Sequence, residues 1–436
     1  MQILILQGVK KMRQKLIALC TVFLLLLVVN PAWAEVNLSI NGNSYRPATA
    51  PQLENGTTMV PLYVLGRVLG AETSVADKVI TIKKGSQTLN LLLNDTKAAL
   101  NGESSIVPQA PILVNDDVMV PLRFACEAFG ATVGWDQISQ TATVQFSEQR
   151  QGMSVEDLLL KSSEAMLQYN TYKTKMNIGM DMEMLNPANQ EESVELAMNM
   201  DMDMAMQQEP LLMYGKVTMD SPAIPEDPIS ATTEMLINED GMFMTMPGQE
   251  GWISMSIPGM DMAELIKQSN NNDPLASLQM MQESGAIMSF GDDQQKDGQS
   301  YWVINVTLGA ENFNKLFEGI MGQMPAVPME DGQDLEQALT EMIQAMFKNM
   351  EADIFYRVWV EQASLLPIFM DLDARIDLDM PATTVGDEVT EPITMHMIET
   401  ASYEIYDLGE PIAVPDVSEA QDLNEYLKQQ MADTRL

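Results

Sequence analysis

The sequence predicts an α+β protein in which a small duplicated β-α-β domain precedes a large antiparallel sheet with inserted helices. Two observations lead to this fold class. A short motif occurs twice in the first third of the chain, and long stretches of the remainder alternate apolar and polar residues. Alternation with a period of two is typical of strands with one solvated face. With 436 residues, 46% of them hydrophobic, the chain is long enough for about two or three domains.

The charge of the chain excludes one large class of partners. The formal net charge is −38 at pH 7. A protein this acidic repels phosphate backbones and anionic lipid surfaces. We therefore expect no nucleic-acid binding.

The first 34 residues are typical of a secretory signal peptide. Four basic residues precede the apolar run Leu16–Val29, and Ala32-Trp33-Ala34 forms an A-x-A cleavage site. The apolar run is shorter than the roughly 20 residues that cross a bilayer, which favours cleavage over the alternative of an uncleaved membrane anchor. We expect export to the medium or to the outer face of the cell envelope, with no transmembrane segment after cleavage.

Cysteine usage leaves no internal disulfide in the mature chain. Of the two cysteines, Cys20 lies in the signal segment, so only Cys126 remains. Stability must then come from the core. Cys126 lies in a predicted amphipathic helix, and we expect a buried structural thiol rather than a nucleophile.

A repeat with an offset of 60 residues defines the first domain, predicted over residues 35–148 with units 35–95 and 96–148. Thr58–Leu62 is matched by Val118–Leu122. The same offset aligns two further pairs of segments, which are Gly70-Ala71 with Gly130-Ala131 and Ile40–Gly42 with Leu100–Gly102. A match at three separated points indicates internal duplication.

Each unit predicts the same local structure. A strand ends at a proline that opens a helix, expected at Leu62–Leu69 and at Leu122–Phe129, since a missing N–H is tolerated in the first helical turn. The following glycine suits the left-handed end of the helix. Alternating strands at Val79–Ile82 and Thr141–Val144 are expected to close the units.

The paired M-V-P-L and G-A segments resemble the copper amine oxidase N-terminal-like domain, over about residues 36–147. That domain is widespread in secreted and surface proteins of Gram-positive bacteria. Copper amine oxidases hold their metal with three histidines in a separate catalytic domain, whereas this chain has only His396. The resemblance implies an accessory module for attachment to a cell-wall or envelope component, without a copper cofactor.

The second domain is predicted from helical and alternating segments. A capping-box variant at Ser154 and Asp157 opens a helix expected at about 154–169. Three long segments alternate apolar with acidic or polar residues and predict strands, namely 176–184, 194–206 and 371–380. Further strands are expected at 211–219, 231–237, 242–246, 251–257, 300–308, 352–361 and 393–406. Helical character is expected within 260–284, at 311–322, at Asp334–Met350 and in the polar residues after 418.

This order of elements resembles the LolA/LppX-like superfamily of envelope lipoprotein and lipid carriers. The segments that carry the resemblance are Trp252-Ile253, Val358–Glu361, Leu366-Pro367 and Val414–Val417. It covers about residues 153–423 and leaves 424–436 as a polar tail. The resemblance implies an antiparallel half-barrel wrapped around helices, with no catalytic motif, and an apolar ligand such as a lipid or acyl chain.

The apolar positions of the alternating strands are the candidate ligand-binding residues. They share one strand face and comprise Met180, Met182, Met200, Met202, Met204, Ile376 and Leu378. Methionine is a flexible apolar filler suited to adaptable surfaces. Copper(I) binding by the 38 methionines is an alternative, because thioethers select that ion. We favour apolar lining, because i, i+2 spacing spreads the sulfur atoms along a strand.

No sequence feature predicts catalysis. Motifs of serine hydrolases, zinc proteases and P-loop enzymes are absent from the sequence, and His396 has no recognisable partner motif. The acidic segments lack the glycine and glutamate positions of a calcium-binding EF-hand loop. Two function classes stay open: a carrier that holds an apolar ligand, and a structural or adhesion component of the envelope whose half-barrel is filled by its own helices.

Overall fold

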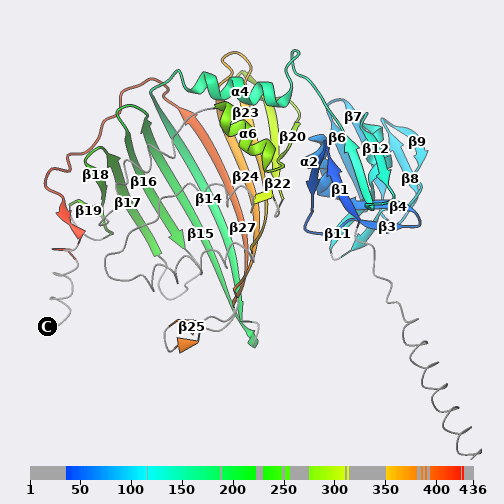
Figure 1. Ribbon diagram of the computed structural model, residues 1–436, viewed down its shortest axis with the longest axis horizontal. Helices are drawn as coiled ribbons and strands as arrows, with labels where there is room; N and C mark the ends of the chain where they lie inside the picture. The colour runs from blue at the N-terminus through cyan, green and yellow to red at the C-terminus, as the bar shows by residue number, and fades with distance from the viewer. Residues whose placement is uncertain are drawn as a thin grey trace, which may run out of the picture.

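The computed structural model describes residues 36–114, 116–186, 189–221, 229–247, 251–255, 274–309, 312–313, 350–380, 384–385, 388–389, 393–423 and 425–426. The predicted signal segment, the predicted helix at 334–350 except for its last residue, and nearly all of the one at 311–322 lie outside these ranges. Among the described helices, none combines the length and apolar character needed to cross a bilayer. The fold is mostly β, with a β-rich N-terminal domain and one large curled sheet (Figure 1).

The N-terminal domain consists of three small sheets and two helices. One sheet has the order β12-β13-β1-β2, another β10-β11-β4-β3 and the third β5-β6-β7-β8-β9. The first six strands are β1 (Asn37–Ile40), β2 (Asn43–Tyr45), β3 (Gln52–Glu54), β4 (Thr57–Pro61), β5 (Glu72–Ala76) and β6 (Val79–Lys84). Those that follow are β7 (Gln87–Leu92), β8 (Lys97–Leu100), β9 (Glu103–Ile106), β10 (Ile112–Val114), β11 (Asp117–Pro121), β12 (Thr132–Asp136) and β13 (Thr141–Gln145).

The two repeats pair with each other through their matched segments. Strands β4 and β11 are antiparallel, with Val60 opposite Val120, so the two M-V-P-L segments face each other about a local twofold axis. The last strand expected in each unit, β6 or β13, joins the sheet that contains the first hairpin of the other unit. Strand β13 pairs with β1, and β6 shares a sheet with β8 through β7. The expected closing strands form as β6 and β13, and their pairing shows that the two units are interleaved.

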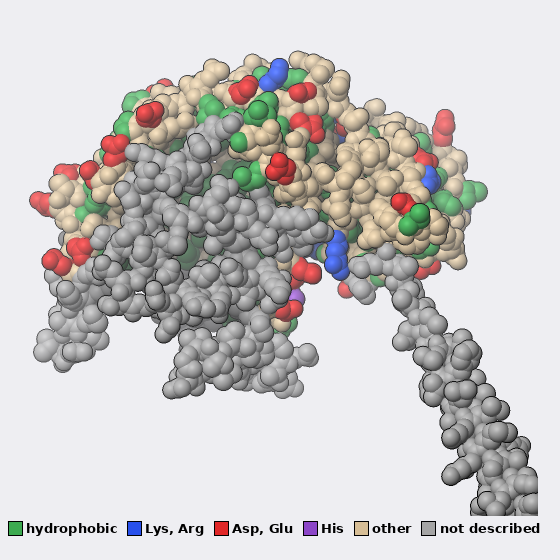
Figure 2. All heavy atoms as spheres, in the orientation of Figure 1, with side chains coloured by type: hydrophobic (Ala, Val, Ile, Leu, Met, Phe, Trp, Pro, Cys, Tyr) green, Lys and Arg blue, Asp and Glu red, His purple; other side chains and the backbone are tan. Residues whose placement is uncertain are grey.

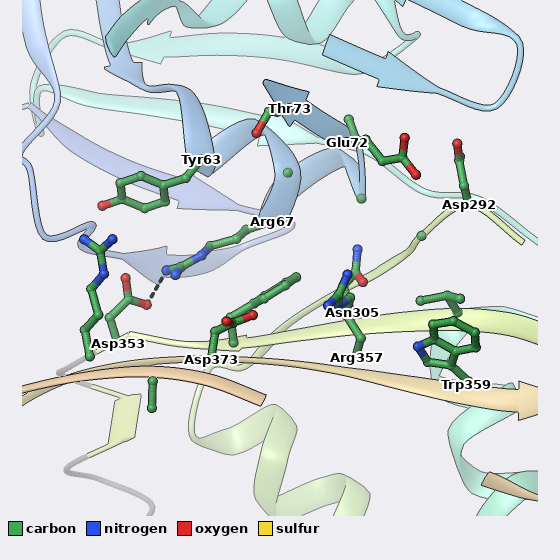
Figure 3. Close-up of a pocket in the computed structure, with 18 of the residues that line it drawn as sticks. Tyr63, Arg67, Glu72, Thr73, Asp292, Asn305, Asp353, Arg357, Trp359 and Asp373 are labelled. Carbon is green, nitrogen blue, oxygen red and sulfur yellow. Dashed lines mark hydrogen bonds and ion pairs between the residues drawn. The ribbon is translucent and has the colours of Figure 1, made fainter. Parts of the chain in front are cut away.

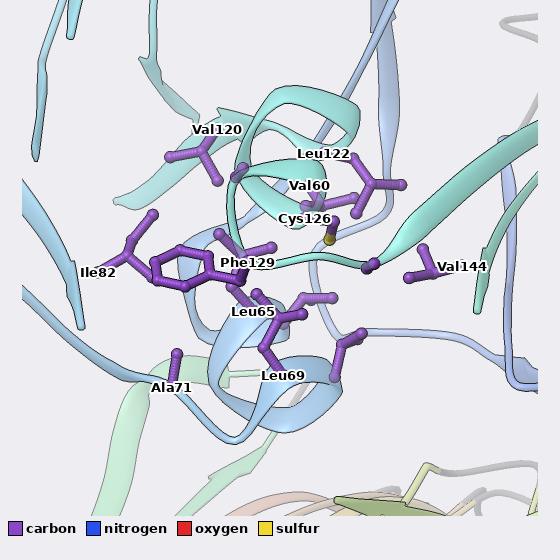
Figure 4. Close-up of a cluster of buried hydrophobic side chains, with 14 of the residues drawn as sticks. Val60, Leu65, Leu69, Ala71, Ile82, Val120, Leu122, Cys126, Phe129 and Val144 are labelled. Carbon is purple, nitrogen blue, oxygen red and sulfur yellow. The ribbon is translucent and has the colours of Figure 1, made fainter. Parts of the chain in front are cut away.

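Both predicted helices follow their prolines. Helix α2 (Leu62–Leu69) begins after Pro61 and α3 (Leu122–Ala128) after Pro121. Their apolar sides meet in the domain core, which Figure 4 shows with Leu65 and Leu69 of α2 near Phe129 at the end of α3. The core thus forms where the two copies of one amphipathic helix are brought together by the β4–β11 pair.

Cys126 is fully buried in this core, as expected (Figure 4). Burial raises the pKa of its thiol to about 12, with a further rise from the charge of Glu127. Because thiolates are the reactive form, the native protein should not react with an aromatic disulfide reagent at pH 8. We expect one thiol per mature chain to react only after denaturation. Stoichiometric labelling of the folded protein would contradict a buried Cys126.

The second domain is dominated by one sheet of 13 strands. Along its path the order is β20-β22-β23-β24-β27-β14-β15-β16-β17-β18-β19-β28, and β21 pairs with β22. The strands of the centre are β14 (Thr171–Asn186), β15 (Asn189–Gln207), β16 (Leu212–Ser221), β17 (Ile229–Asn238), β24 (Pro367–Met380) and β27 (Ile393–Tyr406). Those at the ends are β18 (Gly241–Met244), β19 (Ile253–Met255), β20 (Ile287–Phe290), β21 (Gln294–Lys296), β22 (Gln299–Leu308), β23 (Met350–Glu361) and β28 (Gln421–Asp422). Strands β25 (Thr384–Val385) and β26 (Glu388–Val389) form a separate hairpin.

The pairing is antiparallel except at one edge, where β28 joins β19 in parallel. The polar helix expected after residue 418 is wrong at its start, because Gln421 and Asp422 pair as a strand. Helix α4 (Val155–Met166) begins at the predicted capping box between Ser154 and Asp157. Helix α6 (Pro274–Glu283) lies within the segment expected to be partly helical.

The N-terminal domain packs against the β20–β22–β23 edge of the sheet (Figure 1). Helix α2 lies closest, and the Ser289 hydroxyl donates to the Arg67 carbonyl at 3.0 Å. The buried Lys84 ammonium donates to the Phe290 carbonyl at 2.8 Å and pairs with Glu148 at 2.7 Å. Burial outweighs the Glu148 contact and lowers the Lys84 pKa. These buried polar contacts hold the two domains against each other.

Candidate functional site

The large sheet has one apolar face, which we call the inner face and define as the face toward α4 and α6. In antiparallel pairs, directly opposed residues project to the same side. The register between β15, β14, β27, β24 and β23 places Leu196, Met182, Met397, Ile376 and Ala352 in one row across five strands. Because neighbouring strands lie about 4.8 Å apart, such a row is a continuous apolar surface.

The predicted site residues all fall on the inner face. The register between their strands is continuous, so apolar residues at every second position of each strand lie beside one another across the sheet. Five are half-buried, and they are Met180, Met182, Met200, Met202 and Ile376. Met204 and Leu378 are nearly covered, at 6% and 7% exposure.

Met204 has a distinct local role. It lies opposite Gly215 of β16, and a Cβ at Gly215 would come within 1.9 Å of the Met204 Sδ. The thioether therefore packs over the glycine, in space that any other residue would fill. Met204 contributes to packing within the sheet, while the other methionines keep accessible apolar surface.

Of the residues that the structure describes, helices α4 and α6 cover one end of the inner face. Val155 and Leu158 of α4 pack with Trp302, Ile304 and Val306 of β22. The Tyr356 hydroxyl donates to the Met281 sulfur of α6 at 3.3 Å, and burial raises the Tyr356 pKa to about 12. This end is an ordinary packed core. The apolar surface that remains lies on β24, β27, β14, β15 and β16.

Charged side chains occupy the opposite, outer face. In the view of Figure 2, acidic side chains are scattered over the visible surface of both domains, with few basic ones. His396 of β27 and Asp377 of β24 stand directly opposite each other on the outer face, 2.5 Å apart. His396 thus has a structural partner on the solvated side. Among the described residues, no group of three or more His, Cys, Asp or Glu side chains gathers as a metal site.

Both domains of the chain match models of known protein families. Residues 154–422 match the model of a family of unknown function (DUF6612). The chain belongs to this family. Residues 39–144 match the model of the copper amine oxidase N-terminal domain, the family that the repeat resembles. None of the curated proteins matches the chain in sequence.

Solved structures with a related arrangement share little sequence. The lipoprotein LppX of Mycobacterium tuberculosis is 12% identical, with 59% of this chain and 98% of that one covered and a TM-score of 0.28. LprF of Mycobacterium bovis is 11% identical, with 60% and 96% covered and a TM-score of 0.30. The first bears the name of the LolA/LppX-like superfamily that the second domain resembles. At such TM-scores we draw no function from either.

The sequence predicted a strand at 393–406 but not that this strand, β27, contributes residues to the inner face. Its inward residues Met395, Met397, Ala401 and Tyr403 lie between the inner sides of β14 and β24. The alternation was visible at Met395 and Met397, but Glu399 interrupts it. A strand that is central in the sheet thus looked unremarkable along the chain.

A cavity of about 540 Å³ lies between the two domains (Figure 3). Arg67 projects from α2 toward Asp353 of β23 and forms an ion pair with it. The Arg67 guanidinium also donates to the Tyr45 hydroxyl at 2.6 Å. Burial alone would lower the Arg67 pKa, but Tyr45 and Asp353 outweigh it and raise the pKa. No sequence signal predicted this cavity, because it exists only once the domains dock.

Proposed function

We propose that this protein is an exported, non-catalytic component of the cell envelope that holds an apolar ligand, such as a lipid or acyl chain, against its inner face. The observation that carries the proposal is the set of apolar side chains, most of them half-buried, that spans β24, β27, β14, β15 and β16 with Glu399 as its one charged member. Surface of this kind and extent is rare on monomeric proteins unless it binds something.

Methionine side chains are suited to contact acyl chains of variable shape. Its side chain is unbranched and rotates easily, so it adapts to different partners. The directly opposed pairs Met176–Met202, Met180–Met198 and Met200–Met219 make the surface nearly uniform in chemistry. Uniform, flexible lining favours a bulk apolar ligand over a small molecule recognised by directional hydrogen bonds.

The N-terminal domain is proposed to attach the protein to a cell-wall or envelope component. Its contacts with the β20–β22–β23 edge leave the apolar part of the inner face on the other side of the sheet. Attachment through this domain would therefore not obstruct ligand binding. Cell fractionation tests the localisation, and recovery of the protein in the cytoplasm would contradict it.

The binding proposal is tested with a fluorescent apolar probe and the variant Met180→Gln/Met200→Gln. Glutamine matches methionine in length but not in polarity. Each substitution should weaken apolar contact by about 1 kcal/mol, because these side chains are half-buried. The pair should therefore raise the probe's dissociation constant about tenfold or more.

The matched control is Asp181→Asn, which lies on β14 between Met180 and Met182 but projects outward. It should leave probe binding unchanged. Equal binding by the wild-type protein and the double variant would overturn the proposal and favour a structural role with a filled half-barrel. Cu(I) titration against a chelator checks the copper alternative, for which we expect no tight binding.

A further inference from the structure

Among the described strand residues, the inner face carries one carboxylate, that of Glu399. Glu399 lies on β27, whose register with both neighbours is continuous from Thr394 to Glu404, so its inward orientation follows from that of Met397 and Ala401. The inward positions at 172–184, 194–206, 213–219, 350–360, 370–378 and 395–405 hold no other Asp, Glu, Lys, Arg or His residue. The acidic residues of these strands otherwise project outward.

The surroundings of Glu399 are apolar on both sides. Met180 of β14 and Ala374 of β24 lie directly opposite it. Ala374 and Ala401 are small and buried, so their side chains project little from the sheet beside the carboxylate. Tyr403 lies on the same strand and face, and its pKa is raised by burial and further by the charge of Glu399.

Within the described ranges, Glu399 has no counter-charge. In the described part of the chain, no hydrogen bond or ion pair reaches its side chain, whereas His396, three residues earlier, pairs with Asp377 on the outer face. Burial raises the pKa of Glu399, the expected cost of removing a carboxylate from water. An unpaired carboxylate on an apolar surface is unfavourable for stability alone, which points to a ligand that pairs with it.

We propose that Glu399 selects apolar ligands that carry an ammonium group and holds that group at the middle of the inner face. This inference rests on the proposed function. An ammonium group supplies a positive charge, which none of the described inward positions carries, and a charge-assisted hydrogen bond is about twice as strong as a neutral one. A ligand with a carboxylate or phosphate group would instead be repelled by Glu399 and by the net charge of −38.

The test compares dodecylamine, dodecanol and dodecanoate as competitors of the fluorescent apolar probe on the mature protein. The three share one chain and differ in the head group. Dodecylamine should compete at about 10- to 100-fold lower concentration than dodecanol, as expected of a hydrogen bond between charged groups. Dodecanoate should be the weakest.

Glu399→Gln should remove the preference for dodecylamine, so that the amine competes no better than dodecanol. The control is Glu404→Gln, on the same strand but on the exposed outer face, which should keep the preference. The control separates a local contact from general attraction of amines by the acidic protein. Thermal melting of both variants checks that they are folded.

The outcomes are distinguishable. If the amine and the alcohol compete equally in the wild-type protein, or if Glu399→Gln keeps the amine preference, the selection by Glu399 is wrong while apolar binding stands. If neither the probe nor any of the three amphiphiles binds, the proposed function fails, and this inference fails with it.

Discussion

Replacing Gly70 with alanine is expected to destabilise the protein by about 2–5 kcal/mol and to open the contact between its domains. Gly70 ends α2 with φ +66°, a left-handed conformation that costs other residues about 1–2 kcal/mol. A Cβ there would come within 1.9 Å of the Phe290 carbonyl oxygen and 2.7 Å of its carbon, both in the second domain. Overpacking of this kind costs about 1–3 kcal/mol more, because backbone has to move.

The internal duplication provides the control for this prediction. Gly130 occupies the equivalent place after α3 and also has positive φ, +88°, but nothing lies within 4 Å of its would-be Cβ. Gly130→Ala should therefore cost only the conformational part, about 1–2 kcal/mol. Denaturant unfolding measures both, and limited proteolysis between the domains reports opening. Equal costs at the two glycines would contradict the docking of Gly70 against Phe290.

Replacing Arg67 with methionine is expected to cost about 3–5 kcal/mol, because it leaves the buried Asp353 carboxylate unpaired. The loss includes the hydrogen bond to Tyr45 and the stacking of the guanidinium over the Tyr63 ring, 4.8 Å from its centroid. The second substitution Asp353→Leu should recover most of the lost free energy of unfolding, since an apolar pair can replace a buried ion pair.

Lys97→Met is the comparison for an exposed ion pair. Lys97 pairs with Asp95 at 3.2 Å, and its side chain is 79% exposed. We expect no resolvable change in the free energy of unfolding, because solvent screens an exposed pair. A small effect of Arg67→Met, or a double variant as unstable as the single one, would contradict the role of Arg67 in joining the domains.

The local structure of the N-terminal domain was predictable, but its pairing was not. Pro61, Pro121 and the glycines that follow the helices are strong local signals, and both helices form where they indicate. The exchange of β6 and β13 between the units depends on contacts that are distant along the chain. Strands β1 and β13, for example, pair although they lie about 100 residues apart. Periodicity along the chain identifies strands but not their partners.

The candidate site shows the same division. The alternation in β14, β15 and β24 placed every predicted residue on one face, because strand geometry alone fixes side-chain direction. The contribution of β27 and the position of Glu399 depended on which strands became neighbours. The cavity around Arg67 needed the docking of two domains, whose contacts are single polar groups such as Ser289 rather than a periodic pattern.

Analysis of what leaves the protein on organic extraction tests the central claim most directly. The mature protein, purified without detergent, is extracted, and the extract is examined by mass spectrometry beside that of the Met180→Gln/Met200→Gln variant. We predict an apolar molecule in near-stoichiometric amount from the wild-type protein and less from the variant. An extract without any such molecule, from a protein that also fails to bind the apolar probe, would contradict the proposed role of the inner face.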